Sequence, residues 1–286
     1  MCENALHYTA IPQCAKTIER RHMSPEYNGQ MPEHTAQTLV HKGQMPAHTA
    51  CSQQMSAPWG AYLLKIVSIC ASVYGMSMNW EGLFSLTYFT NISNIAMTCV
   101  LVAALWRLHR QQQQQGERNC NTAAQHRWYR IKFVATLSIF VTFFLYTCFL
   151  APTSSHGFLG AFMQNYGASF ATHVVGPLCA VADFFFYDRD FEPRPFELLF
   201  GVIPPLLYVA YVCVLSLAFG VRWKQTMLAP YNFLNFGAQT GWFGFNPGHV
   251  SSTSLGIGVF YFIVVFALIF LGMAAGFLHI MKSRKR

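Results

Sequence analysis

The chain has 286 residues, of which 53% are hydrophobic and only 10% are charged. Soluble globular domains carry about 25% charged residues, so this composition excludes an ordinary soluble protein. The formal net charge of +8 is divided among short segments between hydrophobic runs. A nucleic-acid partner is therefore not expected, because such partners select one continuous basic surface.

The first 57 residues differ in composition from the rest of the chain. They are polar, contain several prolines and hold a short near-repeat that begins at Gly29 and again at Gly43. Such segments bury too little apolar surface to fold. Residues 1–57 are therefore predicted to be a cytosolic, low-complexity, disordered tail. Residues 58–282 are predicted to form a membrane domain, and residues 283–286 a basic cytosolic tail.

Six hydrophobic runs follow the first tail. A helix needs about 20 mostly apolar residues to cross ~30 Å of hydrocarbon. Runs of that kind occupy residues 59–79, 85–106, 131–151, 163–187, 198–220 and 255–279. The predicted fold class is all-α: a multi-pass transmembrane bundle of six helices. The sequence leaves its oligomeric state open.

Lysine and arginine are distributed unequally between the connecting segments. The link between the fifth and sixth spans holds only Arg222 and Lys224, and Lys65 lies within the first span. The rest of the 19 basic residues lie in or beside the segments at the opposite ends of the helices. An excess of lysine and arginine marks the cytosolic side. Both termini are therefore predicted to be cytosolic, in a plasma membrane or an internal membrane.

The second span carries a stripe of hydroxyl and amide side chains. Helical spacing places Thr87, Thr90, Asn91, Asn94 and Thr98 on one face. Such groups are costly in lipid, so they are expected to face the bundle interior. There they bind water or a ligand, or they hydrogen-bond to a neighbouring helix and have no further role.

The fourth span contains His173, the only histidine near the middle of a predicted span. Ser169 and Asp183 share its helical face, and Pro177 follows one turn later. A proline removes a backbone hydrogen bond and bends the helix, which would open space around the imidazole. The alternative is that His173 is an ordinary residue of the core.

Asp183 stands ten residues after His173, roughly 15 Å along a helix axis. It is therefore too distant to orient the imidazole. We expect it near the cytosolic end, paired with Lys65 or Arg189. The amine of Lys65 is close enough to that end to reach the surface instead.

The fifth span begins with a double proline and continues into an aromatic loop. Pro204 and Pro205 are expected to bend or break the helix, and Tyr208 and Tyr211 follow at helical spacing. Either tyrosine is a candidate to place a phenol in a cavity. Residues 221–254 are rich in aromatic side chains, which predicts a lid or an interfacial segment on the outer membrane face.

Several short motifs resemble a six-span family that includes the androgen-induced membrane proteins, the androgen-dependent TFPI-regulating protein and microbial relatives. These motifs are residues 89–94, His173 with Pro177 and Asp183, Pro204 to Tyr208, and residues 229–235. The resemblance covers about residues 58–282 and matches the number and order of spans. The tail before Trp59 has no counterpart in that family.

Animal members of that family need one threonine and one histidine to hydrolyse fatty acid esters of hydroxy fatty acids. The resemblance implies that Thr90 and His173 are this catalytic pair, with His173 as the base that activates the Thr90 hydroxyl. Asn91 or Asn94 would donate to the oxyanion. The other expected supporting residues are Ser169, Pro177, Asp183 and Tyr208. The expected partners are membrane lipids, with a lipid ester as substrate.

Three alternative functions use the same residues differently. A lipid or small-molecule binding protein or carrier would have the polar stripe and the kinks but no bond cleavage. A haem-binding cytochrome needs paired histidines on facing helices, whereas only His173 lies deep in a span, so no cofactor or metal is expected. An ion channel or transporter would carry more intramembrane charge or an inverted repeat. If Thr90 and His173 come within hydrogen-bond reach of one another around a cavity, the hydrolase is favoured over the binding protein.

Overall fold

The computed structural model describes residues 59–113, 122–188, 191–192, 194–248, 250–251 and 253–284. The predictions made for residues 1–57, for Arg189 and for the last two residues lie outside these ranges. The described residues, from Trp59 onward, belong to one compact unit.

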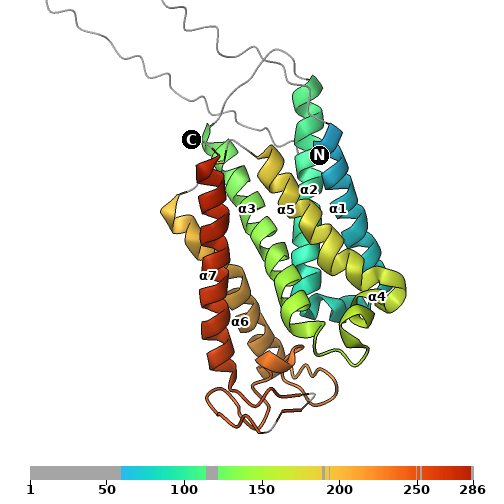
Figure 1. Ribbon diagram of the computed structural model, residues 1–286, viewed down its shortest axis with the longest axis vertical. Coiled ribbons are helices and arrows are strands. Elements are labelled where there is room, and N and C mark those ends of the chain that lie inside the picture. Colours follow the sequence, from blue (N-terminus) through green and yellow to red (C-terminus); the bar gives the residue numbers. More distant parts are fainter. Residues whose placement is uncertain are drawn as a thin grey trace, which may run out of the picture. The chain divides into compact units, whose positions relative to one another are not determined.

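Six helices of this unit are long and apolar enough to cross a membrane (Figure 1). They are α1 (Trp59–Met78), α2 (Phe89–Gln113), α3 (Thr122–Leu145) with the π-helix η2 (Tyr146–Leu150), α4 (Gly157–Phe170) with η3 (Ala171–Val175) and α5 (Gly176–Tyr187), η4 (Pro195–Gly201) with α6 (Ile203–Leu217), and α7 (Val259–Ser283). The described residues contain three isolated β-bridges and no strand. The predicted all-α, six-span fold is confirmed, and it indicates a multi-pass integral membrane protein.

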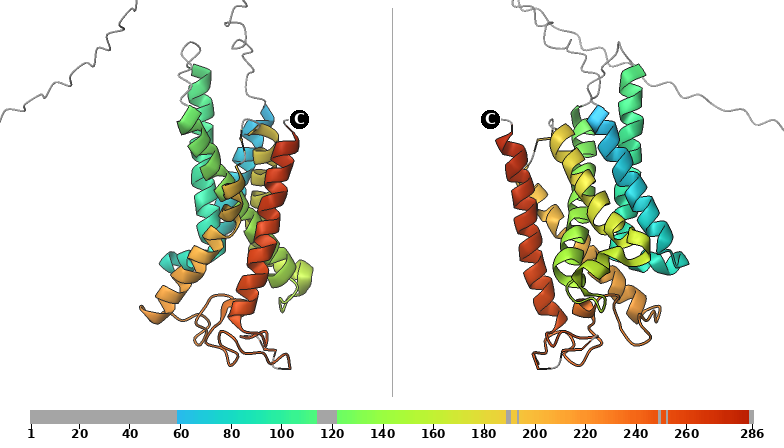
Figure 2. Two further views of the ribbon diagram at one scale, coloured as in Figure 1. Left: turned by 90° about the vertical axis from the view of Figure 1, so that its left-hand side faces the viewer. Right: turned by 45° about the vertical axis from the view of Figure 1, so that its right-hand side comes forward.

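The helices form one bundle with a loop-covered end. Helix α5 packs against both α1 and α3, and α2 packs against the same two helices. Helix α7 packs mainly on η4, while α6 diverges from α7 toward the other end of the bundle (Figure 2). The start of α1 and the end of α7 lie on one side, and residues 218–258 cover the opposite side, which we call the loop end (Figure 1).

The fourth span is interrupted twice, which the sequence predicted only in part. Asn165 and Tyr166 have φ values of 50° and 57°, so the α4 helix breaks there, at a point that no proline marks. A π-helical turn, η3, contains His173 and ends just before Pro177. The predicted distortion beside Pro177 is therefore present as a π-turn, a form often found at functional sites.

The double proline of the fifth span marks a change of helix type. Residues Pro195–Gly201 form the 3-10 helix η4, and α6 begins at Ile203 with the prolines in its first turn. Proline is tolerated there because the backbone N–H groups of a first turn have no partner inside the helix. The predicted break is confirmed at this junction.

Four charged side chains meet inside the bundle, and we call them the charge cluster. Lys65 Nζ lies 2.5 Å from Asp183 Oδ1, and Lys132 Nζ lies 2.7 Å from Asp183 Oδ2 and 2.5 Å from Asp188 Oδ2. All four residues are buried. The predicted Lys65–Asp183 pair is confirmed, whereas the expectation that Lys65 reaches the surface is wrong. Buried charges need such pairing because isolated ones are very costly.

Candidate functional site

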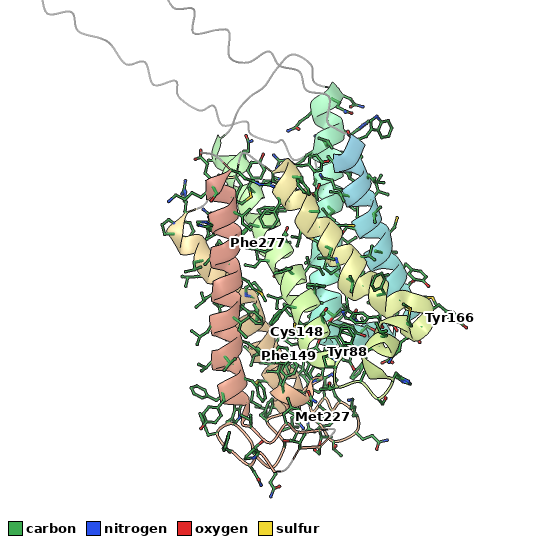
Figure 3. The ribbon with its side chains drawn as sticks, in the orientation of Figure 1. Tyr88, Cys148, Phe149, Tyr166, Met227 and Phe277 are labelled. Atoms are coloured by element: carbon green, nitrogen blue, oxygen red, sulfur yellow. The ribbon has the colours of Figure 1, made fainter. Side chains whose placement is uncertain are left out.

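A polar cavity of about 270 Å³ lies between the helices and the loop. Its walls come from α1, from the first turn of α2 and the segment before it, from η2, from the fourth span and from the loop of residues 218–258. Tyr88, one of its lining residues, lies in the half of the bundle nearer the loop end (Figure 3). Apart from the tyrosines, the polar side chains of the wall are Asn79, Glu81, Ser85, Thr90, Asn91, Gln164, Ser169, Thr172 and His173.

The first turn of α2 presents Thr90 to this cavity. The Thr90 carbonyl accepts hydrogen bonds from Ser93 Oγ at 3.0 Å and from Asn94 Nδ2 at 2.8 Å. Asn91 Nδ2 donates to the Ser85 carbonyl at 2.8 Å, which ties this turn to the preceding 3-10 helix η1 (Gly82–Thr87). The backbone that carries Thr90 is thus held on both sides.

The imidazole of His173 is held by stacking. Its ring lies parallel to the ring of Tyr146, with 3.6 Å between centroids and 6° between planes. The Tyr146 hydroxyl donates to the Ala161 carbonyl at 2.7 Å, which fixes the ring beneath the imidazole. His173 Nδ1 is buried and has no hydrogen-bond partner within the described part of the chain. It is therefore available to a ligand or to a water molecule.

Tyr231 contributes to the cavity from the loop. Burial raises the pKa of the Tyr231 phenol, and hydrogen bonding with Thr90 opposes part of that rise. Burial also raises the pKa of Tyr88, and the neighbouring Glu81 carboxylate adds to the effect. Both phenols are therefore protonated at neutral pH and can donate hydrogen bonds at the cavity wall.

Four of the predicted site residues line this cavity: Thr90, Asn91, Ser169 and His173. They come from two helical segments about 80 positions apart in the sequence. Among the described hydrogen bonds, none joins Thr90 directly to His173. The pair therefore shares a chamber and has no direct hydrogen bond.

The other four predicted residues lie outside the lining. Asn94 is fully buried one turn below Thr90, and its Oδ1 has no hydrogen-bond partner among the described residues. Asp183 belongs to the charge cluster, and Pro177 is buried at the start of α5. The Tyr208 hydroxyl donates to the Thr87 carbonyl at 2.8 Å. These residues hold the framework, and Asn91 remains the predicted amide donor that faces the cavity.

Sequence reasoning did not identify Tyr146 and Tyr231 as site residues. Tyr146 stands in a hydrophobic run, and only the π-turns η2 and η3 bring its ring onto His173. Tyr231 lies within the aromatic motif of residues 229–235, which provided a signal for the segment but not for the residue. In the first half of this loop, Trp223 and Phe233 are buried against the helices. That the loop is a lid or an interfacial segment stays a prediction.

Comparison with known proteins gives no match to a family model, to a curated protein or to a solved structure. The function must therefore be argued from the cavity and its residues.

Proposed function

We propose that this integral membrane protein hydrolyses lipid esters, with Thr90 as the nucleophile and His173 as the general base. The supporting observation is that Thr90 and His173, from separate spans, line one polar cavity in which His173 Nδ1 lacks a partner. A buried polar atom without a partner is uncommon and marks a place where a ligand or water binds. The membrane supplies such a cavity with lipids.

The chemistry proceeds in two steps. His173 accepts the proton of the Thr90 hydroxyl as Thr90 Oγ attacks the ester carbonyl, and the alcohol leaves with that proton. Water, deprotonated by His173, then attacks the acyl-threonine, releases the fatty acid and restores the hydroxyl. Asn91 Nδ2 carries two hydrogens and uses one on the Ser85 carbonyl. Its second hydrogen is a donor for the oxyanion.

The cavity also accounts for the separation of the two catalytic groups. An ester group or a water molecule has to stand between the nucleophile, the base and the oxyanion donor. Catalytic hydrogen bonds are often long in the empty enzyme and shorten when the substrate binds. Substrate binding is therefore expected to bring Thr90 and His173 within reach of the same carbonyl.

A second candidate function is supported by that same lack of a Thr90–His173 bond. A lipid-binding protein or carrier needs a polar chamber for a headgroup and no activated nucleophile. Under this alternative, Thr90 and His173 donate to and accept from a bound headgroup, and no covalent intermediate forms.

Trapping the intermediate separates these two functions. Purified protein is mixed with a panel of lipid esters, quenched rapidly and digested, and the peptide that contains Thr90 is weighed by mass spectrometry. An acyl group on Thr90 is expected in the wild type and absent in Thr90→Ala. Thr98→Ala changes a threonine on the same helix but outside the cavity, so it is the matched control and should still be acylated at Thr90. Lipid retention without acylation or turnover would favour the carrier.

We also infer that both termini face the cytosol. The alternation of six spans supports a common side for the start of α1 and the end of α7, and the basic residues gather on that side. The Lys224→Asn change creates a glycosylation acceptor with Thr226 in the exposed part of the loop. In a eukaryotic cell this variant is expected to gain a glycan that an amidase removes, whereas an acceptor appended after Arg286 should stay unmodified. If only the appended acceptor carried a glycan, the termini would face the opposite side of the membrane.

A further inference from the structure

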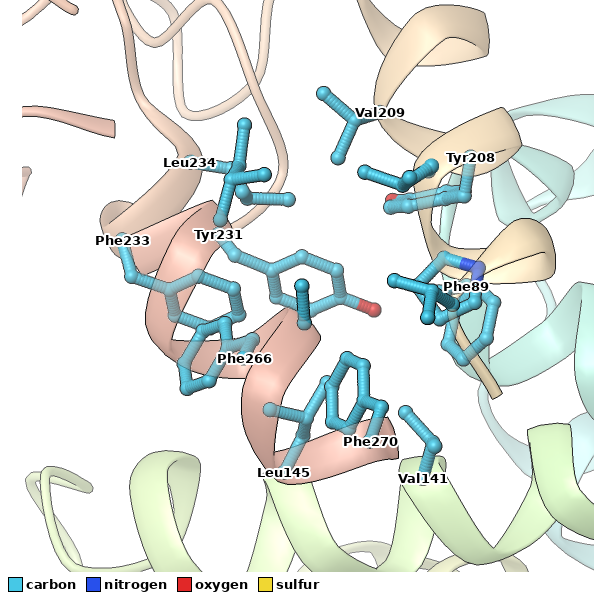
Figure 4. A pocket seen from close by; sticks show the side chains of 15 residues that line it. Phe89, Val141, Leu145, Tyr208, Val209, Tyr231, Phe233, Leu234, Phe266 and Phe270 are labelled. Atoms are coloured by element: carbon cyan, nitrogen blue, oxygen red, sulfur yellow. The ribbon is translucent and has the colours of Figure 1, made fainter. Parts of the chain in front are cut away.

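A second cavity, lined by apolar side chains, lies between α6, α7 and the loop. It encloses about 50 Å³. Its lining includes Val209 of α6, Phe266 and Phe270 of α7, and Phe233 of the loop (Figure 4). The only polar side-chain groups in this wall are the phenols of Tyr208 and Tyr231. Such a space suits hydrocarbon and is a poor site for water.

This apolar cavity borders the lipid-facing surface of the bundle. Helices α6 and α7 diverge toward the loop end, and the loop lies between them (Figure 2). Leu206 lines the cavity and is 44% exposed, so it stands at the rim. Leu207, its neighbour on α6, is 65% exposed and faces away from the bundle. A hydrocarbon chain in the cavity is thus continuous with the bilayer.

The apolar and polar cavities meet at Tyr231. Its ring extends from the loop across the apolar cavity, with the hydroxyl directed toward Phe89 at the start of α2 (Figure 4). Tyr231 lines both cavities, and the adjacent residues Phe89 and Thr90 line one each. These shared linings place the Tyr231 phenol at the boundary between the two cavities. One aromatic side chain therefore separates a polar chamber from an apolar one.

We propose that the apolar cavity is the acyl-chain subsite of the protein. The preferred ligand is an ester of a single, straight acyl chain. Its carbonyl lies beside Thr90, and its chain passes Tyr231, crosses the apolar cavity and leaves between α6 and α7 into the bilayer. The assignment of the carbonyl end rests on the proposed hydrolase function. The chain subsite itself rests on the lining, the rim and the junction at Tyr231.

The small size of the cavity sets a specific expectation for chain length. About 50 Å³ holds only a few methylene groups, since one water already needs roughly 10–15 Å³ of such space. Each methylene removed from water adds about fourfold in affinity. Affinity is therefore expected to rise steeply from butanoate to octanoate esters. It should then level off toward dodecanoate and hexadecanoate, because the rest of the chain lies in lipid.

The test uses a binding readout that does not depend on turnover. Ester affinity is measured on Thr90→Ala protein in lipid nanodiscs, alone and combined with Ala267→Phe, which places a ring in the cavity. Ala275→Phe, an exposed position two turns later on α7, is the matched control. We expect Ala267→Phe to weaken dodecanoate binding at least tenfold and Ala275→Phe to change it less than twofold. Equal effects of the two variants would overturn the subsite.

Photo-crosslinking tests the same subsite in the wild-type protein and does not depend on how the variants fold. An acyl probe with a diazirine on the carbons nearest the carboxyl group should attach to residues 202–209 or 263–270. Attachment at these residues without ester turnover would support the subsite and rule out the hydrolase function. Turnover that needs Thr90, with attachment only elsewhere, supports the hydrolase and overturns the subsite.

Discussion

Replacing Asp183 with asparagine is expected to lower the free energy of unfolding by about 3–5 kcal/mol, the usual cost of breaking a buried ion pair. Asp183 is fully buried and accepts from both Lys65 and Lys132. Lys132 would keep Asp188, but Lys65 would lose its only carboxylate partner in the described structure. Its remaining contact is a 3.3 Å hydrogen bond to the Ala61 carbonyl. An unpaired ammonium would then remain buried.

Two related variants make this prediction specific to charge. Asp188→Asn removes a carboxylate of the same cluster, but Lys132 keeps Asp183, so the loss should be clearly smaller. Adding Lys65→Met to Asp183→Asn removes the unpaired charge and should recover most of the loss. Unfolding followed by circular dichroism in detergent gives the three free energies. If Asp183→Asn had the same free energy of unfolding as the wild type, the charge cluster would make no net contribution to stability.

The charge cluster also explains how a distant residue supports the site. It joins α1 and α3 to α5, the last part of the fourth span. Close packing continues along α1, where Gly75 leaves room for the Thr172 side chain beside His173. Asp183 thus fixes the position of the span that carries His173, although it lies outside the cavity. Its effect on catalysis is expected to follow its effect on folding.

Local sequence signals predicted the spans because each depends on residues close together in the chain. Apolar runs of sufficient length and the double proline at Pro204 are features of this kind. Lys65 and Asp183 are 118 positions apart, and their pairing was predicted from their opposite charges near the same end of the bundle. The bends and breaks were harder to predict. The break at Asn165 and Tyr166 consists of left-handed backbone conformations that continue into Gly167, and the one glycine beside it did not distinguish this break from an ordinary glycine within a span.

The polar stripe of α2 illustrates why helical spacing alone did not define the site. Its members were expected to share one environment, but Thr87 lies before the helix in η1, where it accepts a hydrogen bond from Trp223 Nε1 at 2.9 Å. Thr90 and Asn91 face the cavity, whereas Asn94, a turn further on, is buried in the bundle. The loop and the neighbouring helices decide which members reach the cavity, and these are long-range contacts.

Removing either proposed catalytic side chain should reduce kcat/KM for the preferred ester by about 10²–10⁴-fold. Thr90→Ala leaves no nucleophile, and His173→Ala leaves the hydroxyl protonated. The double variant should be no slower than the more impaired single variant, because nucleophile and base act in the same step. His279→Ala is the matched control, because His279 is exposed and lies near the end of α7 that is away from the loop end. Its kcat/KM should be close to that of the wild type.

This comparison tests the cooperation of the two residues, which the cavity alone does not establish. Two independent ligand contacts would weaken binding additively, so KM would rise and kcat would change little. If the two residues are a nucleophile and its base, removing either one lowers kcat, and removing the second lowers it no further. If the fold-losses of kcat/KM in the two single variants multiply in the double variant, and if they arise from a higher KM, then Thr90 and His173 are headgroup contacts. Hydrolysis would then depend on other residues, and the polar cavity would serve only to bind the lipid.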